Sequence, residues 1–256
     1  MGGDGGNYES VAVDHRRKRQ PIFYVTEDKE YGALRRYIPP YSNAVNRPYV
    51  NWDILHKDGG TTTFLVFNDD GLTFDWTTNE QAARNSQAKH YPNLEGTDFD
   101  DNDGLLYFVS KKRSTLYVLD LLAKTYTTSL TKTGALEWGG WFNHSPDQIV
   151  SHKGGEYLYM TEDGGETVGV YAVHKPTGKR YTMFEAYTDQ YHHDETTGLA
   201  FSPDGKKMYA AFQDCGCDQE DSENGLSYNC GCLLEFSRQD GRSFEGATMG
   251  LKFHST

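Results

Sequence analysis

The stretch Tyr8-Glu9-Ser10-Val11-Ala12-Val13 sets the pattern on which this chain is built. An acidic residue at the start of a strand-like run recurs at Glu95, Asp147 and Glu195. The last two intervals, 52 and 48 residues, are close to the length of one four-stranded propeller blade, roughly 40–50 residues. The first interval, 86 residues, is longer, and we attribute the excess to a short capped helix inserted within 77–91.

Strand-like runs fill each repeat, and turn sequences such as Asn102-Asp103-Gly104 separate them. Connections this short give antiparallel meanders, and repeated meanders give a propeller. A β-sandwich is the alternative, but the recurrence of similar sequence at similar spacing favours the propeller. We therefore predict an all-β fold, a β-propeller of four-stranded antiparallel blades or a portion of one, over residues 1–256. The predicted strands, blade by blade, are 11–14, 22–26, 33–38 and 62–67; 96–100, 105–110, 115–120 and 125–129; 149–152, 157–161, 169–174 and 180–184; 198–201, 207–212 and 233–237.

The composition agrees with this fold and limits the function. Aromatic residues make up 14% of the chain and 27 residues are glycine, which suits pleated strands joined by tight turns. The net charge of −12 argues against a general nucleic-acid binder, which should be basic. No apolar run approaches the roughly 20 residues needed to cross a bilayer. The N-terminal residues resemble no signal peptide, and we interpret Met1 as an artificial start or the edge of a longer protein.

Carboxylates recur at one place in the predicted blades. The start of a blade's first strand and the end of its antiparallel second strand lie on the same face, and two second strands close with Thr-Glu-Asp. We expect several acids to converge at the channel mouth, with Glu95 near Ser110 and Lys111, and Glu195 near Gln213. Clustered carboxylates suit Ca²⁺, which takes six to eight oxygen ligands; solvated turn acids are the alternative. The candidate ligands are Glu9, Glu27, Asp28, Glu95, Asp147, Glu162, Asp163 and Glu195.

Three segments resemble the PhoX-type alkaline phosphatases and their uncharacterised propeller relatives. They are Thr26-Glu27-Asp28 with 32–39, Pro146-Asp147-Gln148-Ile149 with 158–165, and Glu195-Thr196-Thr197-Gly198 with 199–206. The resemblance implies six blades, Ca²⁺ at the channel, and, in active enzymes, iron held by acids and a cysteine. It implies phosphomonoester hydrolysis, in which metal ions clamp the phosphate oxygens. It makes Glu27, Asp147, Glu162 and Glu195 the better ligand candidates, and this chain looks like a C-terminal portion of the family's length.

Other polar groups give further candidates. Arg35 and Arg36 could hold a phosphate, although surface charge is the commoner role of such residues. Cys215, Cys217, Cys230 and Cys232 bracket the loop 215–232 and fit either two disulfides or a zinc site. Disulfides would imply an oxidising compartment, so the predicted location is secreted, extracellular or lumenal. The motif 192–195 lies near the predicted channel mouth and could bind a transition metal or act as a general acid; a solvated loop is the alternative. The aromatic stretch 137–142 could form a wall beside the channel; a seal between blades is the alternative.

Two functions therefore stand side by side. The first is a metal-dependent phosphatase acting on phosphate esters. The second is a Ca²⁺-stabilised structural or binding propeller within a larger extracellular or lumenal assembly with protein partners. Fold alone does not decide between them.

Overall fold

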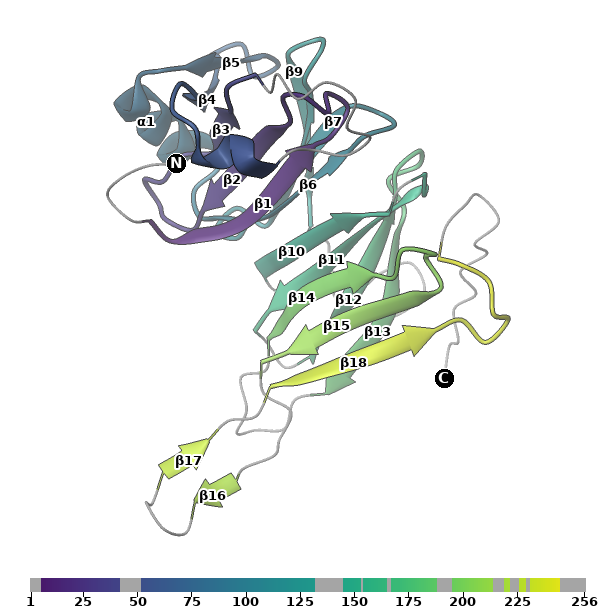
Figure 1. Ribbon diagram of the computed structural model, residues 1–256. Helices are drawn as coiled ribbons and strands as arrows, with labels where there is room; N and C mark the ends of the chain where they lie inside the picture. The colour runs from purple at the N-terminus through teal and green to yellow at the C-terminus, as the bar shows by residue number, and fades with distance from the viewer. Residues whose placement is uncertain are drawn as a thin grey trace. The chain divides into compact units, whose positions relative to one another are not determined.

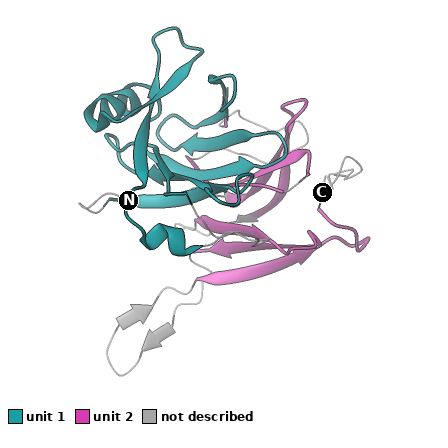
Figure 2. Cartoon of the chain, turned by 45° about the horizontal axis from the view of Figure 1, so that its top comes forward, with its two compact units in different colours: residues 1–130 teal, residues 131–256 magenta. Residues whose placement is uncertain are grey.

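The computed structural model describes residues 6–41, 52–131, 145–152, 154–164, 167–187, 195–213, 219–221, 226–228 and 231–244. The chain divides into two compact units, residues 1–130 and 131–256 (Figure 2). Strands make up most of the described elements, together with one α-helix and one short 3-10 helix (Figure 1). No described helix is long and apolar enough to span a membrane.

The first sheet of unit 1 is an antiparallel meander of five strands in the order β1-β2-β3-β4-β5. Four of them match the predicted blade, and β5 is one more than the sequence suggested. Helix α1 (Glu80–His90) follows β5 and lies inside the segment 77–91; the Asn79 side chain caps it by accepting a hydrogen bond from the Ala82 amide at 3.1 Å. The strands are β1 (Tyr8–Asp14), β2 (Ile22–Glu27), β3 (Arg35–Ile38), β4 (Thr61–Phe67) and β5 (Phe74–Thr77), with the 3-10 helix η1 (Trp52–His56) between β3 and β4.

The second sheet of unit 1 has four strands in the order β6-β7-β8-β9. Its inner strand β6 lies beside β1 of the first sheet, and one aromatic core joins the two sheets. Tyr24 stacks on Phe99, and Phe67 stacks on Tyr126 at 3.8 Å between ring centroids. Aromatic packing of this kind supplies much of the buried apolar area in a chain whose mean hydropathy is low. The strands are β6 (Leu94–Asp100), β7 (Leu105–Ser110), β8 (Thr115–Asp120) and β9 (Thr125–Leu130).

Unit 2 contains a four-stranded sheet, β10-β11-β12-β13, and a sheet of three described strands, β14-β15-β18. The two sheets share a core in which Tyr159, Phe201 and Phe244 pack together. A small hairpin, β16 and β17, lies within the cysteine-bracketed loop 215–232. The strands are β10 (Ser145–Ser151), β11 (Tyr157–Asp163), β12 (Thr167–His174), β13 (Arg180–Tyr187), β14 (Thr196–Phe201), β15 (Lys207–Phe212), β16 (Gln219–Asp221), β17 (Leu226–Tyr228) and β18 (Cys232–Ser237).

Candidate metal site

Each of the four larger sheets has a β-bulge at the same place in its inner strand. In the first sheet Tyr8 pairs with Glu27 and Val11 pairs with Val25, so two residues of β1 face one residue of β2. Strands β6, β10 and β14 show the same two-against-one register. A bulge bends a strand and changes the direction of its side chains, and bulges often occur beside functional sites. The residues at the first bulge position are Glu9, Glu95, Asp147 and Thr197.

This register corrects the sequence repeat in one blade. Glu195 was expected to match the other three acids, but Thr197 occupies that position and Glu195 lies two residues earlier, before β14 begins. The Glu195 carbonyl accepts a hydrogen bond from the Gln213 amide at 2.9 Å, so the expected proximity to Gln213 is confirmed. The spacing in sequence could not show the offset, because the register is fixed by pairing between strands and not by the recurrence of acidic residues.

The threonine of each Thr-Glu-Asp segment stabilises the bulge beside it. The Ser10 amide donates to the Thr26 hydroxyl at 3.0 Å, and the Gln148 amide donates to the Thr161 hydroxyl at 2.8 Å. Both threonines are fully buried. A buried amide that leaves the strand ladder needs such an acceptor. The recurrence of this threonine therefore has a structural reason that is separate from metal binding.

In unit 1 the bulges bring two predicted ligands together. A carboxylate oxygen of Glu9 lies within 4.8 Å of one of Glu95. Glu9 is exposed and Glu95 is buried. Glu95 also forms an ion pair with Lys111, Oε1 to Nζ 3.5 Å, which confirms the expected proximity of these two residues. The arrangement offers carboxylate oxygens from two neighbouring inner strands, the donor type that Ca²⁺ prefers.

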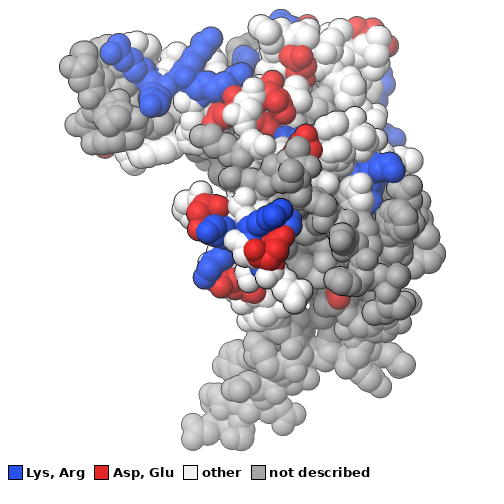
Figure 3. Space-filling model, turned by 90° about the vertical axis from the view of Figure 1, so that its right-hand side faces the viewer, with Lys and Arg blue, Asp and Glu red and all other residues white. Residues whose placement is uncertain are grey.

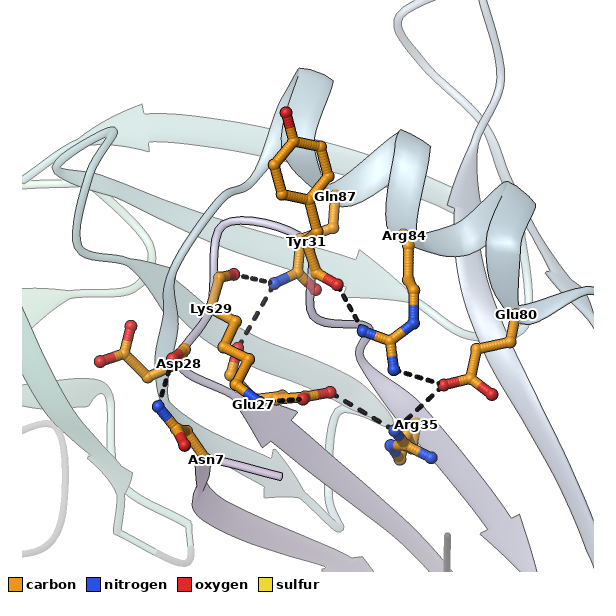
Figure 4. A network of polar contacts seen from close by, with 9 residues as sticks. All are labelled: Asn7, Glu27, Asp28, Lys29, Tyr31, Arg35, Glu80, Arg84 and Gln87. Carbon is orange, nitrogen blue, oxygen red and sulfur yellow. Dashed lines mark hydrogen bonds and ion pairs between the residues drawn. The ribbon is translucent and has the colours of Figure 1, made fainter. Parts of the chain in front are cut away.

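Glu27, another predicted ligand, lies in a network of charged groups (Figure 4). Its buried carboxylate is 3.4 Å from Arg35 Nη2 and 3.7 Å from Lys29 Nζ. Arg35 also pairs with Glu80 of α1 at 3.2 Å, and Arg84 pairs with the same Glu80 at 2.6 Å. The network therefore links the end of β2 to the first turns of α1.

The side chains of the two predicted phosphate-binding arginines have partners within the protein. Arg35 is 6% exposed and packs over the rings of Tyr8 and Phe64. Arg36 donates to the Thr63 hydroxyl at 3.0 Å and lies 4.5 Å above the Trp76 ring. Burial lowers the pKa of the Arg36 guanidinium. The surface-charge alternative considered for these residues thus does not describe Arg35, which is a buried counter-ion of Glu27.

Unit 2 repeats this arrangement with a different central residue. Register places Tyr171 of β12 where β3 has Arg35, because Met160 faces Tyr171 as Val25 faces Arg35. The Tyr171 hydroxyl contacts buried Glu162 at 2.9 Å and Glu185 at 3.0 Å. The pKa of the Tyr171 phenol is raised, chiefly by burial and to a smaller extent by the negative charges of the two glutamates. Sequence reasoning missed Tyr171 and Glu185, since only the register reveals their correspondence with the first sheet.

The structure also describes three further predicted ligands, Asp147, Asp28 and Asp163. Asp147 is buried at the bulge of β10. The carboxylate of Asp28 accepts a hydrogen bond from Asn93 at 2.8 Å. Asp163, partly exposed, is the last residue of β11.

Several other predicted groups are only partly covered by the structure. Cys232 begins β18, whereas Cys215, Cys217, Cys230, residues 192–194 and residues 137–142 lie outside the described residues. The choice between disulfides and zinc therefore stays a prediction.

No family model matches the chain, and no curated protein matches it. Solved structures do resemble it. A structure of Pseudomonas fluorescens PhoX in complex with vanadate, a transition state analogue, superposes with a TM-score of 0.66 at 18% identity, covering 92% of this chain and 54% of that one. A nidogen/laminin complex gives a TM-score of 0.50 at 14% identity, covering 81% and 60%.

These likenesses establish the fold, a PhoX-like β-propeller of antiparallel sheets, and confirm the predicted fold class. At such low identity they establish nothing finer. The chain spans little more than half the length of the PhoX chain it matches.

Proposed function

We propose that this chain is a Ca²⁺-binding PhoX-like β-propeller and that Glu9 and Glu95 belong to its ion site. The observation that carries the proposal is the approach of their carboxylate oxygens to within 4.8 Å of one another. Two like charges at this separation repel, most strongly where one of them is withdrawn from water, as Glu95 is. A hard cation bound between them would convert this repulsion into attraction and would supply the charge that oxygen ligands favour.

The bulge register supports the same assignment. An ion site built from several strands needs its carboxylates at equivalent positions. The bulge provides such a position, because it interrupts the alternation of side chains at the same point of each inner strand. Unit 2 has the acid Asp147, also buried, at this position of β10. Asp147 is therefore the candidate ligand of unit 2.

Thermal unfolding with and without Ca²⁺ tests the proposal. Saturation to about 100 times the dissociation constant stabilises a folded protein by roughly 2.7 kcal/mol, which corresponds to a rise in Tm of roughly 5–10 °C for a unit of this size. We expect chelator-treated protein to melt lower than protein with Ca²⁺. Glu95→Gln should abolish that difference, and Asp147→Asn tests unit 2 separately. Glu30→Gln is the matched control, because Glu30 is a half-exposed acid of unit 1 whose partner is the surface residue Lys112. An unchanged Tm after chelation would contradict the proposal.

Hydrolysis of phosphomonoesters is a second candidate function. It is favoured by the superposition over 92% of this chain with a PhoX structure that is a complex with vanadate, a transition state analogue. Carboxylate-held Ca²⁺, with iron as a further cofactor, would clamp the phosphate oxygens and polarise the ester. Release of p-nitrophenol from p-nitrophenyl phosphate, with Ca²⁺ and iron supplied, measures this activity. If Ca²⁺ raises the Tm but no p-nitrophenol is released, the propeller is a Ca²⁺-stabilised structural or binding module, consistent with a place in an extracellular or lumenal assembly.

A further inference from the structure

The turn between β1 and β2 is strongly basic. It contains His15-Arg16-Arg17-Lys18-Arg19, all exposed, in a chain of net charge −12. Arg16 is held by Asp14 through two hydrogen bonds, at 2.9 and 2.8 Å. Among the residues that the structure describes, Arg17 and Lys18 form no ion pair. A group of lysine and arginine side chains is visible at the upper left of the face drawn in Figure 3. The turn thus presents two cations, Arg17 and Lys18, that no acid in the described part of the chain pairs with.

Exposed aromatic side chains flank this turn. Arg19 donates to the Tyr41 hydroxyl at 3.2 Å, and its guanidinium lies 6.0 Å from the centre of that ring. The His15 ring meets Trp52 edge-on at 6.2 Å between centroids. Tyr41 is 55% exposed and Trp52 is 49% exposed. Large rings left this open beside cations indicate a contact surface, because burying such rings is normally favourable.

A leucine extends the aromatic part of this surface. Trp52 and Leu55 belong to η1, and residues three apart on a 3-10 helix lie above one another on the same side. Ile54 is fully buried and anchors the helix, whereas Leu55 is 36% exposed. We call the resulting surface the basic–aromatic patch. Its members are Arg17, Lys18, Arg19, Tyr41, Trp52 and Leu55.

We propose that the basic–aromatic patch binds membrane surfaces that contain anionic lipids. Lysine and arginine are attracted to the negative surface potential of such a membrane. Tryptophan and tyrosine favour the depth of the headgroups, and leucine favours the boundary with the acyl chains. Single-stranded nucleic acid could stack its bases on the rings and pair its phosphates with the cations, but it has no apolar region in which the exposed leucine could be buried. This proposal is independent of the ion site.

Nearby acids limit the strength of this interaction. Asp53 and Asp58 flank Leu55 in the sequence, and Asp101 accepts a hydrogen bond from the His15 amide at 3.3 Å. We therefore expect reversible binding that requires anionic lipid and weakens as salt is added, since screening reduces the attraction between exposed charges.

Co-sedimentation of the full chain with vesicles tests the proposal. We expect binding to vesicles of mixed phosphatidylglycerol and phosphatidylcholine, and none to phosphatidylcholine alone. Each basic side chain near an anionic surface contributes about 1 kcal/mol, so Arg17→Gln with Lys18→Gln should lower the partition coefficient about 25-fold. The matched control is Lys179→Gln with Lys206→Gln, which makes the same change in net charge on exposed turns of unit 2.

Trp52→Phe gives a second readout and keeps an aromatic ring against Phe23, whose ring centre is 6.1 Å from that of Trp52. Insertion of Trp52 into the headgroup region shifts tryptophan emission to shorter wavelength, and this shift should disappear in the variant. The proposal is wrong if the chain does not bind anionic vesicles but does bind an oligonucleotide or a sulfated polysaccharide. It also fails if the double variant of the patch and its control bind lipid equally well.

Discussion

Replacing Arg35 with methionine should destabilise unit 1 severely. The Arg35 guanidinium is the buried counter-ion of Glu27, at 3.4 Å, and the Glu27 side chain is 2% exposed. Removing one partner of a buried pair costs about 3–5 kcal/mol, because it leaves a charge withdrawn from water. Lys29, at 3.7 Å and 44% exposed, can recover part of this cost. The contact with Glu80 adds little, since Glu80 is 40% exposed and its carboxylate reaches water. We therefore expect a loss of about 3 kcal/mol.

Urea denaturation followed by tryptophan fluorescence measures this loss. Arg84→Met is the matched control: it removes another arginine from the same network. The partners of Arg84 are the half-exposed Glu80 and the exposed Tyr31 carbonyl, so this variant should cost less than about 1 kcal/mol. The double variant Glu27→Gln with Arg35→Met removes both charges and should lie within about 1 kcal/mol of the parent. If the double variant is as unstable as Arg35→Met alone, lost packing rather than charge explains the effect and the reasoning is wrong.

The same variant also tests the predicted role of Glu27 as a ligand. Without Arg35, a cation bound at Glu27 would be the remaining compensation for its charge. Ca²⁺ should then stabilise Arg35→Met more than it stabilises the parent. An equal effect on both proteins would indicate that Glu27 serves the fold and does not bind the ion.

Three further predictions concern the bulge, the pH dependence and the cysteines. Thr26→Val leaves the bulged Ser10 amide without its acceptor and should cost about 1–3 kcal/mol in urea denaturation, whereas Thr128→Val on the exposed face of β9 should cost less than about 0.5 kcal/mol. Burial raises the pKa of Tyr117 to about 12, whereas the phenol of the unfolded chain loses its proton near pH 10. The free energy of unfolding should therefore be constant with respect to this group below pH 10 and should fall by roughly 3 kcal/mol as the pH rises from about 10 to 12. Tm measurements across this pH range, with tyrosine ionisation followed by absorbance, test this expectation. Thiol titration of denatured, unreduced protein should find no free thiol among the four cysteines if they form disulfides, and four thiols with release of zinc if they bind that metal.

Periodicity and turn chemistry were sufficient to predict most of the strands. In the second sheet the predicted strands 105–110 and 115–120 coincide with β7 and β8, since hydrophobic runs there are bounded by clear turn residues. Strand β5 was missed because Phe74-Asp75-Trp76-Thr77 is short and adjoins the helix cap at Asn79. Local sequence cannot show that such a segment completes a sheet by pairing with β4.

The site was predicted less completely than the fold. The acids at Glu9 and Glu95 were found because their position recurs in the sequence, and the structure brings them together. The role of Arg35 was missed because arginine is usually exposed, and only three-dimensional packing shows that Glu27 needs a buried cation. Likewise, only the register shows that Tyr171 of β12 occupies the position that Arg35 occupies in β3.

The bulge position also has a practical consequence for protein engineering. The bulge position carries glutamate in the first two sheets, aspartate in the third and threonine in the fourth, so the same register accommodates side chains of different size and charge. The fourth sheet has Thr197 where the other three sheets have an acid, and Thr197→Asp would give it a carboxylate at the same position. Such a change would raise the number of bulge carboxylates in unit 2 from one to two.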